Sequence, residues 1–454
     1  MPDLDHDHAD DHADDHDPLP AALSRRLSTE PADVRRALTV LGEVLSGGSR
    51  STTTANGFVE THLRLPHTAL VSERVDLTNT RAVSVGAALA DLVDLHGAVL
   101  GPVEDDEPPT WQRIDLLDEH VSVPTSAAAF FPAGTATDAD VVVQLAEHEY
   151  EPQPASLRVL SRPGDHAAAR TLADALLATA RRDKGFYRGR VLHADAHLPL
   201  KLKPTALGPG GREDLVLPAH VWTEIDANVA ALTSRADLLR SLGLGTNRGV
   251  LLAGPPGVGK SALSRVVARE LAGGFTVIIV DAAAASSVLR QVYRETTDLG
   301  PCVVVLEDVD LYLGDRKAGA RGTALADFLA VLDGTEEYRD VLTLASTNDP
   351  SALDAAATRS ARFDAVVHLA APDREACEAI LRRLFGRFGG DSPDAGVDCA
   401  AVAAHLPPGV TGADLREIVR RTVLGHGDAL TTDAVLQVVR DGRWQPAPLT
   451  GNYL

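Results

Sequence analysis

Cysteine is scarce in this sequence. Its three cysteines, Cys302, Cys377 and Cys399, are scattered and show no CxxC spacing. A sparse, odd set argues against a disulfide scaffold and is typical of a reducing compartment. The sequence also lacks a cationic, apolar N-terminal signal and any apolar run near the roughly 18 residues that cross a bilayer. We therefore expect a cytoplasmic protein with no membrane contact.

Lysine is almost missing as well, and the net charge is strongly negative. The lysines are Lys184, Lys201, Lys203, Lys260 and Lys317. A lysine inside a motif is therefore no by-product of a lysine-rich composition. The formal net charge is -21, part of it from an Asp-rich start with no basic residue at positions 3–17. An acidic surface disfavours nucleic acid and anionic lipid, and no DNA-binding motif is recognisable, so neither is expected as a partner.

The composition changes along the chain in a way that predicts several domains. At roughly 100–200 residues per domain, 454 residues predict about two to four. The divisions are a disordered Asp/His-rich tail, an N-terminal α+β region of unknown function, a small α+β domain, a Pro/Gly-rich linker, an α/β core and a helical lid with a C-terminal tail: residues 1–20, 21–130, 131–206, 207–214, 215–371 and 372–454. Histidines in the tail could hold a transition metal loosely, but a solvated acidic tail is the better interpretation.

Residues 21–206 contain short elements of both kinds and no catalytic constellation. Strand-like runs cover 58–65, 69–77, 140–145 and 155–160, and helical periodicity covers 83–100 and 165–180. His193 and His197 lie near Asp195, but strand and turn surround them. Surface or structural histidines are therefore favoured over a metal site.

A glycine-rich loop, residues 254–261, follows an apolar strand and precedes a helix. Its glycines let several backbone N–H groups point at one spot, where the helix N-terminus adds its positive end. Lys260 can reach the β- and γ-phosphates, and the Ser261 hydroxyl can join a magnesium shell. The candidate nucleotide ligands are Gly254, Pro255, Pro256, Gly257, Val258, Gly259, Lys260, Ser261 and Ala262.

Polar residues at later strand ends indicate what happens to the bound phosphates. An apolar strand runs directly into Glu307 and Asp308. One carboxylate can hold Mg²⁺ and the other can polarise the attacking water, whereas an acidic strand end on a surface loop is the alternative. The next strand ends at Asn348, which can hydrogen-bond the water or the γ-phosphate. Arg359 and Arg362 follow and could reach a phosphate, although alone they would more often be salt-bridge residues.

These segments together resemble the AAA+ ATPases, and closely the AAA subgroup, over residues 215–440. The loop at 254–261 is similar to the Walker A motif, residues 306–310 to Walker B, and Asn348 to sensor 1. Residues 353–364 match the second region of homology, L-D-x-A-x-x-R-x-x-R-F-D, without a gap. Alternating strands and helices agree with a parallel sheet. The expected fold is α/β, an AAA+ core with a C-terminal helical lid, preceded by the α+β region and the acidic tail.

The resemblance also implies roles and partners. Arg359 and Arg362 would act as arginine fingers on a neighbouring subunit's nucleotide, and Gly412 and Ala413 would lie by the adenine and ribose. ATP and Mg²⁺ are the implied cofactors. The implied assembly is a homo-oligomeric ring, commonly a hexamer, with a protein substrate or adaptor engaged through the N-terminal region.

Two departures from the family pattern bear on function. The Walker B strand ends in Glu307-Asp308 where most members have Asp-Glu, so by position Glu307 takes the metal and Asp308 is the base. Residues 281–287 lack the aromatic pore loop of many unfoldases, and the basic loop at 314–322 is a candidate replacement or a plain mobile loop. We expect an ATPase that remodels or regulates a protein partner. A slow-hydrolysing switch or scaffold is the alternative, and a DNA remodeller comes third.

Overall fold

The computed structural model describes residues 54–105, 107–147, 154–195, 200–313, 338–349, 363–386, 396–427, 430–442 and 444. The described residues from 55 onward belong to one compact unit. The predicted acidic tail and the basic loop at 314–322 lie outside the described residues. In the part of the chain that is described, no helix is long and apolar enough to cross a membrane.

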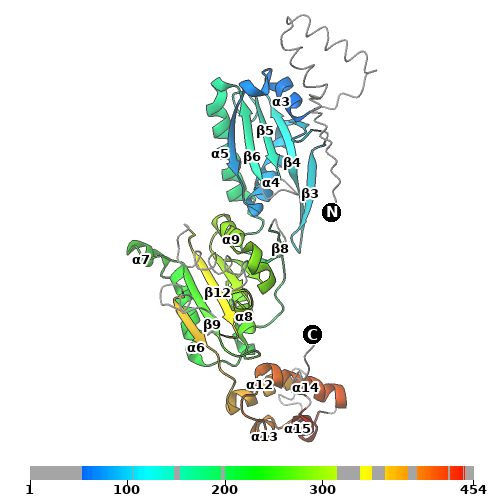
Figure 1. Cartoon of the computed structure of the whole chain (residues 1–454), viewed down its shortest axis with the longest axis vertical. Coiled ribbons are helices and arrows are strands. Elements are labelled where there is room, and N and C mark those ends of the chain that lie inside the picture. The colour runs from blue at the N-terminus through cyan, green and yellow to red at the C-terminus, as the bar shows by residue number, and fades with distance from the viewer. Residues whose placement is uncertain are drawn as a thin grey trace, which may run out of the picture. The chain divides into compact units, whose positions relative to one another are not determined.

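The first part of the described chain is a six-stranded antiparallel sheet (Figure 1). The strand order is β1-β6-β5-β4-β2, and β3 also pairs with β4. Helices α4 (Asn79–His96) and α5 (His166–Asp183) cover one face through a shared apolar core. The strands are β1 (Val71–Asp76), β2 (Val99–Gly101), β3 (Thr110–Asp115), β4 (His120–Phe131), β5 (Val141–Ala146) and β6 (Ser156–Ser161).

Helix α3 (Ala55–Leu63) covers the other face of this sheet. The strand predicted at 58–65 is therefore wrong. Phe58, Val59 and Leu63 are buried against the sheet residues Ala128, Val142 and Leu160. A short apolar run has no periodicity that separates a buried strand from a buried helix, and here the face of the sheet decides it.

The structure divides the N-terminal half differently from the sequence prediction. The predicted boundary at 130/131 falls inside β4, which pairs with β5 along residues 126–131. Residues 131–206 contribute to two sheets, because β7 (Val191–Ala194) and β8 (Leu202–Pro204) extend the second sheet. Both differences result from strand pairing between distant parts of the chain, which local composition does not predict.

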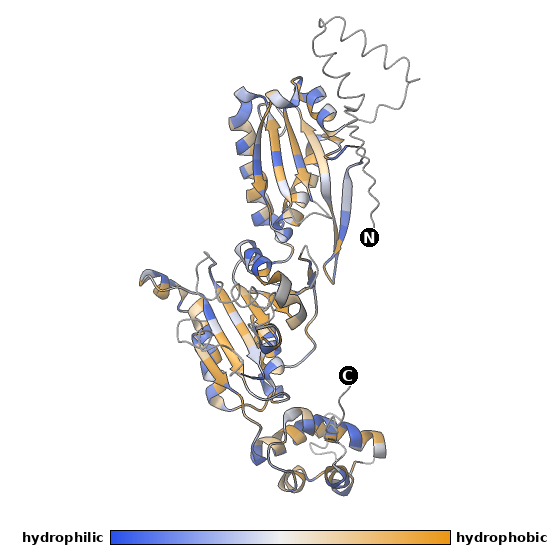
Figure 2. Cartoon of the chain, viewed as in Figure 1, coloured by the Kyte–Doolittle hydropathy of each residue, from blue (hydrophilic) through white to orange (hydrophobic). Residues whose placement is uncertain are grey.

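The second sheet has seven strands in the order β13-β9-β12-β11-β10-β7-β8. All neighbours are parallel except β8, which runs antiparallel to β7. Two apolar cores fill its two faces, as in a doubly wound α/β fold, so the predicted fold class is confirmed. Apolar residues predominate in the strands of this sheet (Figure 2). The remaining elements are β9 (Arg248–Ala253), β10 (Thr276–Val280), β11 (Cys302–Leu306), β12 (Val341–Thr347), β13 (Ala365–His368), α6 (Ala219–Leu232), α7 (Ala236–Ser241), α8 (Lys260–Leu271), α9 (Ala282–Leu299) and α10 (Asp310–Leu313).

Four helices follow the second sheet and share a separate core. Three begin with a side-chain cap: the Asp398 carboxylate and the Thr411 and Thr431 hydroxyls accept backbone N–H groups. The predicted helical lid thus corresponds to α12 (Arg374–Gly386), α13 (Cys399–Ala404), α14 (Gly412–His426) and α15 (Thr432–Asp441).

A buried carboxylate of α9 caps α4 of the first sheet. Glu295 accepts from the backbone N–H groups of Asn79 (2.8 Å) and Thr80 (3.0 Å) and from the Thr80 hydroxyl (2.6 Å). These N–H groups would otherwise have no partner in the first turn of the helix, where a negative charge is also favourable. Burial raises the pKa of Glu295, and the bonds from Thr80 and Asn79 oppose that rise. The two sheets are therefore joined through a polar contact shielded from water.

The turn between β3 and β4 makes an apolar contact with the same helix. Leu116 is fully buried in a core that includes Ala284, Val288 and Val292 of α9. Arg190, before β7, donates to the backbone oxygen of Leu116 and to the Glu119 carboxylate (2.9 Å). The hairpin and α9 therefore share one apolar core, and Glu295 in the C-terminal half of α9 is bonded to α4.

Replacing Glu295 with alanine is expected to destabilise the protein by on the order of 3 kcal/mol, because three donors, two of them buried, lose their acceptor at once. Denaturant unfolding of the full chain measures the change. Arg294→Ala, an exposed neighbour on the same helix, should change stability by less than about 0.5 kcal/mol. Equal effects of the two substitutions would contradict a capping role for Glu295.

Candidate functional site

The glycine-rich loop between β9 and α8 is shaped by close contacts. A Cβ on Gly254 would lie 2.1 Å from the backbone oxygen of Leu369, so only glycine fits there. Gly257 and Gly259 have φ values of 84° and 106°, a region that glycine adopts without strain. Helix α8 then begins at Lys260, so the loop leads directly into the N-terminus of a helix.

Lys260 is the centre of the site. Its Nζ donates to the backbone oxygens of Gly254 (2.7 Å) and Pro255 (2.9 Å) and to Oδ1 of Asn348 (2.8 Å). The side chain is buried, and this burial lowers the pKa of Lys260, while the charges of Asp308 and Asp310 oppose the shift. The ammonium is thus held at the carboxyl end of the sheet with acceptors that a phosphate oxygen can replace.

Asn348 links this lysine to the carboxylates after β11. Its Nδ2 donates to Oδ1 of Asp308 at 3.0 Å, so its two amide atoms contact opposite charges. We refer to these contacts as the Lys260–Asn348–Asp308 hydrogen-bond chain. The parallel order β9-β12-β11 brings the three strand ends together at one edge of the sheet. The structure therefore joins three residues that the sequence predicted separately.

Two further residues hold this arrangement, and the sequence analysis missed them. Ser346 Oγ accepts from the N–H of Asp308 (3.1 Å), and Asp310 Oδ1 accepts from the N–H of Asn348 (2.9 Å). Asp308 also has a left-handed backbone with φ of 50°, which costs a non-glycine residue energy. Asp310 stands two positions after Asp308, and Ser346 stands two before Asn348. The bonds between the two segments follow only from their pairing in three dimensions, so the sequence spacing alone does not predict them.

Glu307 lies on the α8 side of the same strand end. Its Oε1 is 4.0 Å from Nη2 of Arg265, and its backbone N–H donates to Val280 O (3.2 Å). No group of three His, Cys, Asp or Glu that could hold a metal occurs among the described residues. Mg²⁺ in nucleotide sites needs only one or two protein oxygens, completed by phosphates and water. The Ser261 hydroxyl and the Glu307 carboxylate fit that requirement.

The lid contacts the loop through the start of α14. The N–H of Ala413 donates to the backbone oxygen of Gly257 at 3.1 Å. A Cβ on Gly257 would lie 2.7 Å from Oγ1 of Thr411, which together with Asp414 forms the capping box of α14. The predicted nucleotide residues Gly412 and Ala413 thus lie against the phosphate loop.

A family model for AAA, the "ATPase family associated with various cellular activities", matches residues 250–371. The chain contains an AAA domain. The matched residues include the glycine-rich loop, β11 and β12. The predicted resemblance to the AAA ATPases is therefore confirmed.

Several curated proteins are similar to this half of the chain. An ATP-dependent zinc metalloprotease FtsH of Acidothermus cellulolyticus is 33% identical over 239 residues, 48% of this chain and 35% of that protein. A nuclear valosin-containing protein-like protein of Mus musculus is 31% identical over 234 residues (47% and 27%). An ATPase family gene 2 protein homolog B of Bos taurus is 35% identical over 201 residues (41% and 25%). The chain thus spans 25–35% of the length of these relatives.

The segment expected to lack a pore loop is the start of a helix. Helix α9 of the AAA domain begins at Ala282, inside residues 281–287. Asp281 explains this start, because its Oδ1 accepts from the N–H of Ala284 (2.9 Å) and caps the helix. The alanine run therefore has good helix formers and a cap, which favour helix over loop.

The predicted arginine fingers, Arg359 and Arg362, lie outside the described residues. His197 does as well, so the His193/His197 pair is described only in part. His193 Nδ1 is 3.6 Å from the Asp195 carboxylate and its Nε2 is 3.7 Å from that of Asp281.

Replacing Lys260 with alanine is expected to abolish nucleotide binding, because the loop at 254–261 then lacks its one lysine. Titration with a fluorescent ATP analogue measures this directly. Lys201→Ala, an exposed lysine before β8, is the matched control and should bind as the parent does. Undiminished binding by Lys260→Ala would contradict the assignment of the site.

Proposed function

We propose that the chain hydrolyses ATP as a homo-oligomeric ring, with six copies as the leading ring size, and thereby remodels or regulates a protein partner. The observation that carries the proposal is the Lys260–Asn348–Asp308 hydrogen-bond chain. It links a phosphate-binding lysine, a γ-phosphate sensor and a candidate base at one edge of the sheet.

Lys260 and Asn348 would respond together to the γ-phosphate. Without phosphate, the ammonium satisfies the backbone oxygens of Gly254 and Pro255. Phosphate oxygens are better acceptors for a partly desolvated ammonium, so Lys260 would turn from the carbonyls to the nucleotide. Asn348 would then contact the terminal phosphate while still holding Asp308.

The two carboxylates would divide the chemistry. Asp308, held by Asn348 Nδ2 and by Ser346 Oγ, would accept a hydrogen bond from the attacking water and orient it. Glu307 and Ser261 would hold Mg²⁺, which supplies charge neutralisation on the phosphates. Asp308 is one methylene shorter than the glutamate usual in this family, and its left-handed backbone (φ of 50°) would help to set where its carboxylate lies.

Arg359 and Arg362 would complete the site of the next subunit. Planar, permanently charged guanidinium groups stabilise the charge that spreads over the transferring phosphate. Residues 21–206 would engage the protein partner. Helix α9 joins the two sheets, because its Glu295 is bonded to the start of α4. The strand that precedes α9, β10, is in turn bonded to Glu307.

A nucleotide-dependent switch that hydrolyses ATP slowly is the second candidate. Two observations favour it: the Glu307-Asp308 order, and the helical, aromatic-free start of α9. A DNA-associated remodeller ranks third because the chain carries a net charge of -21. Phosphate release well under about one per minute with tight ATP binding would select the switch.

Phosphate release per subunit is expected to rise with protein concentration as the ring assembles, because each site needs an arginine from its neighbour. Arg362→Ala should lower it by roughly 10³-fold or more without loss of ATP binding. Arg339→Ala, which removes an exposed arginine outside the proposed site, is the control. A turnover independent of concentration, or unchanged in Arg362→Ala, would remove the proposed shared site.

The two carboxylates should separate in a magnesium titration. Glu307→Gln is expected to raise the Mg²⁺ concentration needed for half-maximal turnover by at least about tenfold, since a metal ligand is lost. Asp308→Asn is expected to lower turnover by about 10²-fold or more at saturating Mg²⁺ while ATP still binds. The reverse pattern would exchange the two roles. Asp308→Asn loaded with ATP is also the variant with which to capture a protein partner.

A further inference from the structure

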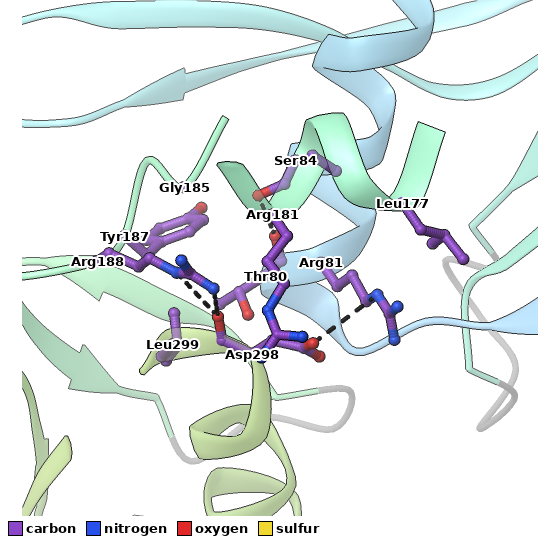
Figure 3. A pocket seen from close by; sticks show the side chains of 11 residues that line it. Thr80, Arg81, Ser84, Leu177, Arg181, Gly185, Tyr187, Arg188, Asp298 and Leu299 are labelled. Atoms are coloured by element: carbon purple, nitrogen blue, oxygen red, sulfur yellow. Dashed lines mark hydrogen bonds and ion pairs between the residues drawn. The ribbon is translucent and has the colours of Figure 1, made fainter. Parts of the chain in front are cut away.

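A small cavity lies where the first sheet's helices meet the AAA domain. Its volume is about 30 Å³, and α4, α5, the segment before β7 and the end of α9 line it. Three arginine side chains reach it from three of these elements: Arg81, Arg181 and Arg188 (Figure 3). None of its residues belongs to the nucleotide site.

The cavity carries an excess of positive charge. Arg188 donates to the backbone oxygen of Asp298 (2.8 and 3.1 Å), a neutral acceptor that leaves its charge uncompensated. The Asp298 carboxylate lies 3.8 Å from Arg81 and accepts from the Thr78 hydroxyl (2.9 Å). It is the one carboxylate among the lining residues, so three guanidinium groups less one carboxylate give a local charge of +2. That is unusual in a chain of net charge -21.

Arg181 is the residue that points to a ligand. Within the described ranges it has neither a hydrogen-bond nor an ion-pair partner, although neighbouring basic residues are paired. Arg182 binds Asp183 (2.8 Å) and Lys184 binds Asp91 (2.6 Å), both away from the cavity. The guanidinium extends from α5 toward Asp298 and Thr80 in Figure 3. An unpaired planar fork beside two other arginines matches the geometry of a phosphate group.

We propose that this cavity binds a phosphate group, either free phosphate or a small phosphomonoester, with Arg181 as its principal ligand. The size agrees, since about 10–15 Å³ holds one water and 30 Å³ holds a small oxyanion but no nucleotide. Tyr187 also lines the cavity, and burial raises its pKa to about 12, so its hydroxyl keeps its proton.

A bound phosphate would tie the two sheets together. Arg81 and Arg181 belong to helices of the first sheet, whereas Arg188 is bonded to the end of α9 in the AAA domain. The anion would therefore add a charge-assisted contact beside the buried Glu295 cap. Because Arg181 and Arg188 are exposed to solvent, binding is expected in the roughly millimolar range and should weaken as salt is raised.

The test uses the full chain carrying Lys260→Ala, so that phosphate cannot occupy the nucleotide site. Inorganic phosphate and glycerol phosphate are titrated separately at constant ionic strength, followed by calorimetry and by the shift in melting temperature. Saturable binding is expected for at least one of them, and the tighter probe tells free phosphate from an ester. Absence of saturable binding by both would overturn the proposal.

The matched variants are adjacent arginines. Adding Arg181→Ala should weaken binding by at least about tenfold, and Arg181→Lys, which keeps the charge but not the fork, should weaken it less. Adding Arg182→Ala should leave binding unchanged, because that side chain is paired with Asp183 outside the cavity. Equal binding by the Arg181→Ala and Arg182→Ala proteins would also overturn the proposal, whatever the ATPase activity of the parent.

Discussion

The structure depends on how a buried ammonium group is satisfied at the edge of a parallel sheet. Lys260 is 6% exposed, and a charge so placed requires acceptors on every side. Two backbone carbonyls and Asn348 supply them without ligand. The strand order β9-β12-β11 is what brings these acceptors together, so the topology of the sheet and the electrostatics of the site are one constraint. Ser346 and Asp310 then hold the backbone on either side.

Much of the candidate site could be expected from the sequence, because several of its parts are local. A glycine-rich loop must follow a strand and open a helix, and carboxylates after apolar strands must gather at one edge. Lys260, Asp308 and Asn348 were assigned in that way and do meet. The roles of Ser346 and Asp310 were not predicted. Each of these side chains accepts a hydrogen bond from the backbone of the other segment. Nothing in either segment alone indicates that exchange.

The N-terminal half could be predicted far less well, because its order is set by contacts distant in the chain. Residues 58–65 looked like a strand, but the sheet face beneath them buries Phe58 and Leu63 on a helix. The chain around β7 and β8 looked like part of a small domain, but these strands lengthen the AAA sheet. The helical start of α9 has a local cause, the cap at Asp281.

The buried bond between Glu295 and the start of α4 has a consequence for how the two parts of the chain relate. A fragment that began at the linker would keep the carboxylate and lose all its donors, and the apolar site of Leu116 would open to water. The half of the chain that contains the AAA domain therefore depends on its contacts with the first sheet. Its helix α9 is complementary to one particular neighbour, so the two halves must change together: a replacement for the first sheet would need a helix start and a leucine in the same two places.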